Sequence, residues 1–136
     1  MVQSFFQRNL QFNRSFKKKL NEQLMKVGLY HSQWSIIYYL KQFDTTTLVE
    51  ISNYLDVEKP TITRTVNRLE EQQLVVKIPS EDKRERRIQL TGKGLALYEE
   101  AKQIVDAFER SLLTGIPDDD QKKTVEVMQL LLEKLK

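Results

Sequence analysis

The stretch that decides the fold spans residues 47–91 and reads TLVEISNYLDVEKPTITRTVNRLEEQQLVVKIPSEDKRERRIQLT. Thr47 and Glu50 stand three residues apart before an apolar run. This is the spacing of a capping box, so a helix is predicted to begin there. A second helix is predicted over residues 58–72, with Pro60 in its first turn, where the missing amide hydrogen costs nothing. Its inner face is predicted to carry Ile62, Val66 and Leu69.

Two short apolar stretches follow this helix pair and predict a β-hairpin. They cover residues 74–78 and 87–90 and flank a charged turn. Two short helices followed at once by a hairpin are the order of a winged helix-turn-helix domain, whose second helix enters the DNA major groove. The side chains predicted to point outward or to flank the outer face of that helix are Pro60, Thr61, Thr63, Arg64, Asn67 and Arg68. Arginine, asparagine and threonine can bond to base edges, although a solvated helix face of ordinary polar residues has a similar composition.

The turn of the hairpin is strongly basic. Four cations fall within five residues where a strand pair projects into solvent, namely Lys83, Arg84, Arg86 and Arg87. Such a tip can reach phosphates, and an arginine there can enter a narrow minor groove. Asp82 and Glu85 are expected to orient these arginines. Charged turns are common on soluble proteins, so the prediction of DNA binding depends on the helix pair and the turn together.

The rest of the chain is predicted to be helical, which makes the fold class mainly α (α+β). Helices are expected over about residues 1–26, 32–43, 91–113 and from residue 118 onward, with Thr91 as a cap and Gly115 and Pro117 as end signals. The first and last helices carry more apolar surface than one chain needs. The last helix carries two apolar stripes, Val125, Met128, Leu132 and Leu135 on one and Val127, Leu130 and Leu131 on the other. One of the two is expected to pack within the chain and the other against a second copy. A homodimer follows, with a plain intramolecular helix pair as the alternative.

Composition narrows the function classes. The chain has 136 residues, 40% hydrophobic and 30% charged, with a net charge of +3 and a pI of about 9.1, which is typical of an ordinary folded domain with a mild basic excess. It contains no cysteine, which excludes disulfides, thiolate nucleophiles and thiol redox switches. Its one histidine, His31, is expected to be structural. No nucleophile-base pair, phosphate loop or metal cluster stands out, so we expect no enzyme, no metal and no cofactor.

The sequence offers no sign of membrane insertion or export. No apolar run approaches the roughly 20 residues that a spanning helix requires, and the polar start does not have the pattern of a secretory leader. A cytoplasmic protein without membrane contact is therefore expected.

The motifs resemble those of the MarR-type transcriptional regulators over nearly the whole chain. The hairpin is similar to the family signature D-x-R-x-x-x-I-x-L-T-x-x-G, with its fixed positions filled by Asp82, Arg84, Ile88, Leu90, Thr91 and Gly94. Two further matches are the entry into the second helix, through Gly28-Leu29 and Gln33-Trp34, and the helix from Pro60 to Glu70. Two positions depart from the family: Gln73 stands where glycine is usual, which leaves the turn geometry open, and Glu58 where a serine cap is common.

The resemblance implies a function and a division of labour along the chain. It implies a homodimer that binds a palindromic double-stranded operator, most often as a repressor. The chain would be one domain over residues 1–136, with dimerisation helices at about 1–28 and 115–136, a winged helix-turn-helix at 32–91 and a connecting helix at 92–113. Arg84 would be the minor-groove arginine, with Asp82 holding it, and the major groove would be faced by Thr61, Thr63, Arg64, Asn67 and Arg68.

The resemblance also implies an effector. Family members commonly respond to a small aromatic or phenolic ligand bound between the dimerisation helices and the winged domain. The candidates to line such a pocket are Tyr30, Trp34, Tyr38, Tyr39 and Phe43, although aromatics at helical spacing are more often core residues. The alternative function is a protein-interaction module that kept the winged fold but no longer reads DNA; Arg64, Arg68 and Arg84 argue against it.

Overall fold

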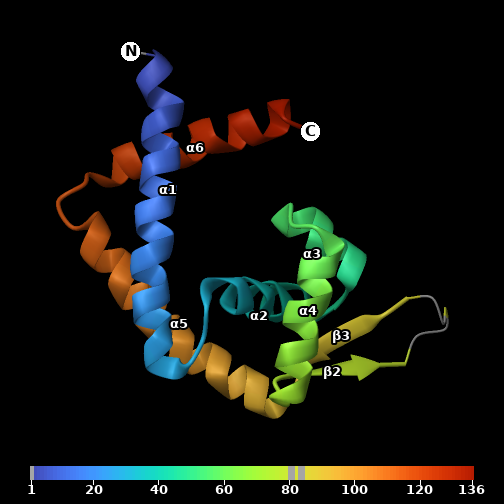
Figure 1. Cartoon of the computed structure of the whole chain (residues 1–136). Helices are drawn as coiled ribbons and strands as arrows, with labels where there is room; N and C mark the ends of the chain where they lie inside the picture. The colour runs from blue at the N-terminus through green and yellow to red at the C-terminus, as the bar shows by residue number, and fades with distance from the viewer. Residues whose placement is uncertain (1, 80–81, 83–84) are drawn as a thin grey trace. The chain divides into compact units, whose positions relative to one another are not determined.

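The computed structural model describes residues 2–79, 82 and 85–136, and the chain divides into two compact units, Met1–Asp106 and Ala107–Lys136. The first unit contains the predicted helix pair and hairpin (Figure 1), together with a three-stranded antiparallel sheet. Its helices are α1 (Val2–Leu24), a 3₁₀ turn (Met25–Val27), α2 (His31–Phe43), α3 (Leu48–Leu55) and α4 (Lys59–Glu71). Helix α5 (Gly92–Leu113) begins in the first unit and ends in the second.

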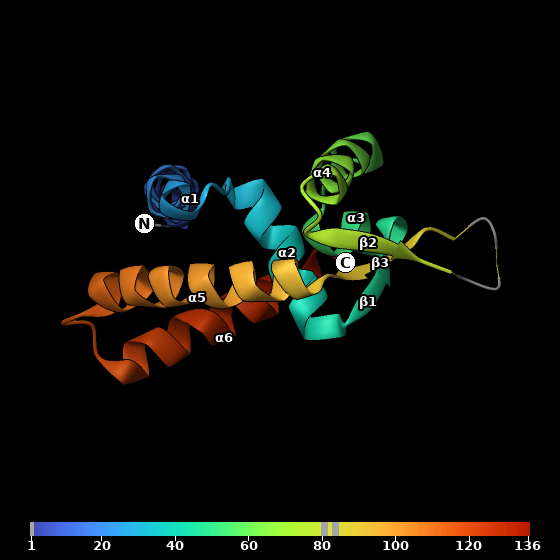
Figure 2. The same ribbon diagram turned by 90° about the horizontal axis from the view of Figure 1, so that it is seen from below.

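The sheet has one strand more than the sequence predicted. Strands β2 (Val75–Ile78) and β3 (Arg87–Leu90) form the hairpin, which extends away from the helices in Figure 2. A third strand, β1 (Thr45–Thr47), pairs antiparallel with β3, so the order is β1-β3-β2. Three consecutive threonines show no apolar alternation that would distinguish a strand from a loop. Pairing across about forty residues of chain makes this segment a strand.

The core of the first unit comes from the apolar faces that helical periodicity indicated. In α4, Ile62, Val66 and Leu69 are all buried, as predicted. The indole of Trp34 stacks on the ring of Tyr98 from α5, with centroids 5.5 Å apart. The largest fully buried side chains come from seven elements and the loop before α2: Leu24, Leu29, Ile36, Ile37, Leu40, Thr46, Ile51, Leu69, Val75 and Ile88. This shared core holds the helix pair against the sheet.

The turn from α4 into β2 adopts the geometry that the departure at Gln73 left open. Gln73 has φ +63°, in the left-handed region where family members usually have glycine. Its amide donates to the carbonyl of Glu70 at 2.9 Å, and the amide of Leu74 donates to that of Leu69 at 2.9 Å. These two bonds are the Schellman pattern that closes a helix end. The glutamine therefore takes the glycine conformation, at a cost of roughly 1–2 kcal/mol for a residue with a Cβ.

Thr91 and Gly94 join the hairpin to α5. The hydroxyl of Thr91 donates to the carbonyl of Gln73 at 2.6 Å and accepts the Gly94 amide at 3.0 Å, so Thr91 caps α5 as predicted. A Cβ placed on Gly94 would lie 2.1 Å from the backbone oxygen of Leu74. The T-x-x-G part of the signature is therefore a packing requirement where the end of α4, the start of β2 and the start of α5 meet.

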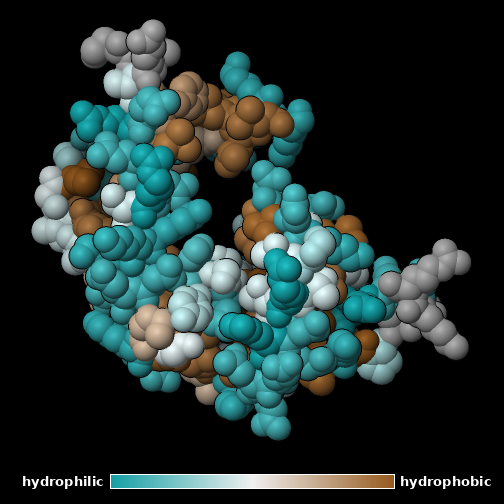
Figure 3. Space-filling view, in the orientation of Figure 1, coloured by the Kyte–Doolittle hydropathy of each residue, from teal (hydrophilic) through white to brown (hydrophobic). Residues whose placement is uncertain are grey.

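The second unit consists of the end of α5 and helix α6 (Asp118–Lys134). The chain turns between them at Gly115, which has φ +85°, and Asp118, Asp119 and Asp120 lie in the first turn of α6, where carboxylates favour the positive helix start. No residue of α6 is buried, and hydrophobic surface lies open over this helix in Figure 3. The members of one apolar stripe, Val125, Met128, Leu132 and Leu135, are exposed by 40–82%. On the other stripe, Val127 and Leu131 are half-buried, while Leu130 is 59% exposed.

Helix α1 divides into a buried end and an exposed end. Leu20 and Leu24 enter the core of the first unit. The apolar side chains nearer its start are about half exposed or more: Phe5, Phe6, Leu10 and Phe12. A row of exposed phenylalanines on an amphipathic helix is typical of a surface that another helix covers.

Candidate nucleic-acid interface

The outer face of α4 presents the polar side chains that the helical wheel placed there. Thr61 and Thr63 are half-buried, and the other four residues of the predicted set are exposed: Pro60, Arg64, Asn67 and Arg68. Arg64 Nη2 donates to Thr61 Oγ1 at 3.3 Å, which draws the guanidinium along the helix toward its first turn. Figure 3 shows teal and near-white surface over this helix. The face therefore offers bidentate donors and hydroxyl groups that can bond to base edges.

Helix α4 begins without a side-chain cap. Glu58 occupies the N-cap position with φ −59° and ψ 140°, and its carboxylate makes no capping hydrogen bond. Its carbonyl accepts the amides of Thr61 at 3.1 Å and Ile62 at 3.2 Å, and Pro60 lies in the first turn as predicted. The start of the helix therefore depends on backbone geometry and proline, and the exposed carboxylate of Glu58 adds a negative charge beside the candidate interface.

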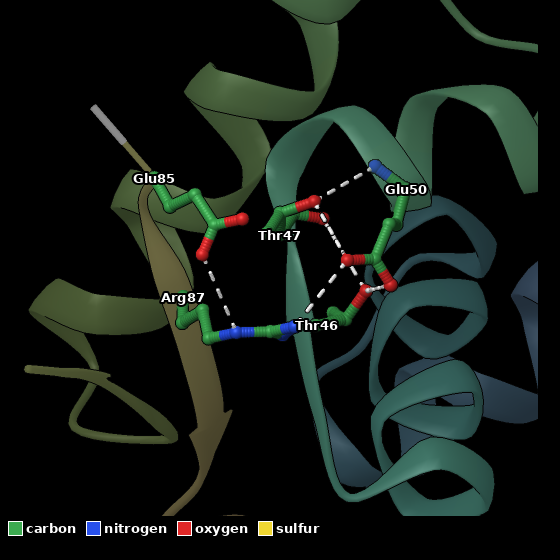
Figure 4. A network of polar contacts seen from close by, with 5 residues as sticks. All are labelled: Thr46, Thr47, Glu50, Glu85 and Arg87. Carbon is green, nitrogen blue, oxygen red and sulfur yellow. Dashed lines mark hydrogen bonds and ion pairs between the residues drawn. The ribbon is translucent and has the colours of Figure 1, made fainter. Parts of the chain in front are cut away.

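The start of α3 carries a polar network, drawn in Figure 4. Thr47 Oγ1 accepts the Glu50 amide at 3.1 Å, which confirms the predicted helix start. The other half of the predicted capping box differs. The Glu50 carboxylate accepts the hydroxyls of Thr47 at 3.1 Å and Thr46 at 3.4 Å, whereas the prediction paired it with the Thr47 amide. Thr47 ends strand β1 and pairs with β3, so its backbone belongs to the sheet.

Arg87 completes this network from the hairpin side. Its Nη2 lies 3.6 Å from Glu50 Oε1, and its Nε lies 3.8 Å from Glu85 Oε2. The Arg87 side chain is 32% exposed, less than either carboxylate. One guanidinium thus lies between a carboxylate of α3 and a carboxylate just before β3 (Figure 4).

A cleft of about 550 Å³ opens beside this network. It is lined by Thr47, Leu48, Val49 and Glu50 of the α3 start, Lys59 and Thr63 of α4, and Glu85 and Arg86 before β3. The cleft therefore brings the helix pair and the base of the hairpin to one surface. Lys59 and Arg86 supply positive charge to it.

The tip of the hairpin is only partly described. Lys83 and Arg84, two of the predicted DNA-contacting residues, lie outside the described residues, so the proposed hold of Asp82 on Arg84 does too. Asp82 is exposed, and its carbonyl accepts the Glu85 amide at 2.9 Å. Arg86 is exposed and Arg87 is half-buried.

The five aromatic residues predicted to line one ligand pocket lie in three places. Trp34 and Tyr38 cluster with Tyr98, whereas Tyr39 and Phe43 cluster with Tyr54 of α3. Tyr30 lines a shallow cleft of about 220 Å³ with Ser32, Gln33, Arg64, Thr65 and Arg68. Side chains on one helix at close spacing still point to different neighbours, and the sequence held no signal for Tyr54 or Tyr98 as their partners.

His31 lies at the start of α2 against α1. Its amide donates to Asn21 Oδ1 at 2.7 Å, and burial together with the nearby charge of Lys17 lowers the pKa of its imidazole. Among the residues that the structure describes, no three acidic or histidine side chains gather closely enough to hold a metal ion. No described helix is both long and apolar enough to cross a membrane.

An antiparallel hairpin beside a helix-turn-helix, with a polar face on the second helix, defines a winged helix-turn-helix protein. Comparison with known proteins agrees: the MarR family model matches residues 29–85. An uncharacterized HTH-type transcriptional regulator of Bacillus subtilis (strain 168), YwoH, is 41% identical over 135 residues, which cover 96% of this chain and 98% of the relative. A second HTH-type transcriptional regulator, SAV2265 of Staphylococcus aureus (strain Mu50 / ATCC 700699), is 34% identical over 136 residues, which cover 98% of this chain and 93% of the relative.

Solved structures show the same fold. Staphylococcus aureus MarR in complex with salicylate and kanamycin superimposes with a TM-score of 0.88 at 34% identity, covering 98% of this chain and 91% of its own. A C80S mutant of MarR from E. coli, solved with operator DNA, has a TM-score of 0.82 at 24% identity, covering 98% of this chain and 94% of its own. The chain belongs to the MarR family and is a DNA-binding transcriptional regulator, as the signature in the hairpin predicted.

Proposed function

We propose that this chain reads DNA with α4 in the major groove while the hairpin follows the adjacent backbone and minor groove. The observation that carries the proposal is the cleft of about 550 Å³, which places α4, the start of α3 and the base of the hairpin on one surface. Base readout would come from Thr61, Thr63, Arg64, Asn67 and Arg68, with Pro60 packed against the groove. Lys83 and Arg86 would contact phosphates, Arg84 would enter the minor groove, and Asp82 would support it.

We propose that the protein acts as a homodimer. The exposed apolar side chains of α6 and of the first half of α1 support this, because contiguous apolar surface of this kind is typical of an interface. In this scheme the chain is one domain, with residues 1–28 and 115–136 as dimerisation helices, 32–91 as the winged helix-turn-helix and 92–113 as the connection. Two α4 helices about one DNA turn apart would read a palindromic operator.

We propose that binding represses transcription and that a small aromatic carboxylate or phenol releases the protein from DNA. The support for an effector is the relative of known structure that was solved with salicylate. A regulator of this kind acts on chromosomal DNA, hence in the cytoplasm at the nucleoid. We propose no catalytic role, since the curated relatives are transcriptional regulators.

The test begins with selection of a preferred duplex from a random-sequence library by repeated rounds of binding. The selected duplex and a scrambled duplex of equal length are then titrated with the protein at several salt concentrations. We expect a palindromic preference and binding to the selected duplex at least about a thousandfold tighter than to the scrambled one. Equal binding to both would favour the protein-interaction alternative. Adding salicylate to the complex tests the effector, and a reporter gene placed behind the selected duplex tests repression.

A further inference from the structure

We propose that Arg87 is a positioning residue, whose guanidinium joins Glu50 of α3 to Glu85 of the hairpin and so holds the hairpin in register with α4. This inference rests on the proposed function and changes the role expected for one cation of the basic turn. In the sequence, Arg87 belongs to one charged run with Lys83, Arg84 and Arg86. The contacts across the fold separate it from Arg86.

The geometry of the guanidinium carries the argument. Nη2 lies 3.6 Å from Glu50 Oε1 and Nε lies 3.8 Å from Glu85 Oε2, so two of its nitrogens lie within ion-pair distance of carboxylates on two segments. The planar fork of an arginine suits such a bridge, whereas a lysine offers a single point charge. Arg87 is also the first residue of β3 and pairs with Thr47 of β1 and Ile78 of β2. Its backbone and its side chain therefore both connect the hairpin to the start of α3.

The Glu50 end of the bridge is itself fixed. Its carboxylate accepts hydroxyls from Thr46, which is fully buried, and from Thr47, which caps α3. A carboxylate held by two hydroxyls cannot follow a moving arginine far, so Arg87 is drawn to a defined place. On the other strand of the hairpin, Lys77 Nζ lies 3.6 Å from Glu70 Oε1 of α4. The hairpin is thus tied to α3 through β3 and to α4 through β2.

The charges around the cleft explain why a bridge is needed there. Glu50 and Glu85 line the cleft that is proposed to face the DNA backbone, and two unpaired carboxylates would repel phosphates. Arg87 compensates both, and among the described residues that line the cleft the cations are Lys59 and Arg86. The ion pairs of Arg87 with Glu50 and Glu85 are partly exposed. Their loss should therefore change the position of the hairpin and the charge of the cleft more than the stability of the fold.

The test compares Arg87→Met with Arg86→Met, the same substitution at the neighbouring exposed arginine. Binding to the duplex selected above is measured across a salt series. A lost phosphate contact lowers the slope of log affinity against log salt by about 1, and we expect this for Arg86→Met. For Arg87→Met we expect about three- to tenfold weaker binding with the slope unchanged. A slope lowered as in Arg86→Met would show that Arg87 contacts phosphate and would overturn the proposal.

Glu50→Gln is an independent test, because the two roles of Arg87 predict changes in DNA affinity of opposite sign. Glutamine still serves the capping position, so α3 should keep its start. If Arg87 acts through Glu50, Glu50→Gln weakens binding, and the double variant with Arg87→Met is no weaker than either single one. If Arg87 touches DNA, removing a nearby negative charge strengthens binding and the two effects add. Unchanged affinity in both single variants would likewise overturn the proposal.

Two further measurements separate positioning from general damage and from failure of the proposed function. Repeating the duplex selection with Arg87→Met should broaden preference at the flanking positions read by the hairpin while the positions read by α4 stay sharp; uniform broadening would contradict a positioning role. In the DNA-free protein, the NMR resonance of the Arg87 Nε–H should shift in Glu85→Gln. That shift tests the bridge even if no duplex is selected, and its absence would overturn the inference.

Discussion

Helix α4 and the base of the hairpin are both rich in arginine, yet their arginines have different surroundings. On α4, Arg64 bonds only within its own helix in the part of the chain that the structure describes, and Arg68 is exposed beside it. At the hairpin base, Arg87 is engaged by carboxylates from two segments. The difference teaches that the number of cations in a basic run does not give the number of DNA contacts. A cation that already compensates carboxylates has less charge to offer a phosphate.

The largest effect is expected at the junction between α4 and the hairpin, where a substitution should disturb both regions together. In Gly94→Ala the new Cβ would meet the Leu74 carbonyl oxygen, a backbone atom that already accepts the Thr91 amide at 3.1 Å. We expect destabilisation by about 3 kcal/mol, because the neighbour cannot rotate away. Urea unfolding measures it. Gly92→Ala is the matched control, since a Cβ there meets nothing within 4 Å, and an equal loss in both variants would contradict the packing argument.

The division of labour between α4 and the hairpin can be sharpened on DNA. Arg64→Ala should cost about 1–3 kcal/mol on the selected duplex and relax preference at one base position, because a base contact carries sequence information. Arg86→Ala should instead weaken binding to selected and scrambled duplexes alike. Fluorescence anisotropy with both duplexes distinguishes the two patterns. Equal losses on both duplexes in Arg64→Ala would remove that residue from base readout.

A substitution in the turn between α4 and β2 should make the protein more stable. Gln73→Gly is expected to stabilise the protein by about 0.5–1 kcal/mol, because glycine relieves the strain of φ +63° but loses more chain entropy on folding. Thermal unfolding is the measurement. Gln72→Gly, one residue earlier at φ −79°, serves as the control and should not stabilise. A stabilisation at both positions would show that relief of the positive φ at Gln73 is not its cause.

The smallest expected effect concerns pH and lies outside both regions, at His31. Burial and the charge of Lys17 lower the pKa of this imidazole in the folded state below its ordinary value of about 6.5. The unfolded chain therefore binds the proton more readily, so stability should fall as the pH drops below that value. Urea unfolding between pH 7.5 and about 5 checks this. His31→Gln should flatten the dependence, and an unchanged slope would assign it to other groups.

Much of the candidate site followed from the sequence because local periodicity decides it. The i, i+4, i+7 spacing of Ile62, Val66 and Leu69 fixed which side of α4 faces inward, and so which polar residues face outward. The Thr47 cap and the hairpin strands were also predictable from short-range chemistry. The third strand was not, because its three threonines become a strand only by pairing with β3. The aromatics predicted to line a ligand pocket separate on α2 because the partners of two groups, Tyr54 and Tyr98, lie on other elements.

The sequence by itself determined the family, the helix-turn-helix with its hairpin, and the outer face of α4. These depend on hydrogen bonding and apolar spacing within one element, which are readable along the chain. The tertiary structure decided what the charges do: it drew Arg87 to Glu50, thirty-seven residues away in the sequence, and left Arg86 exposed beside the cleft. Charge compensation depends on distance in space, and that distance is set only once the elements pack together.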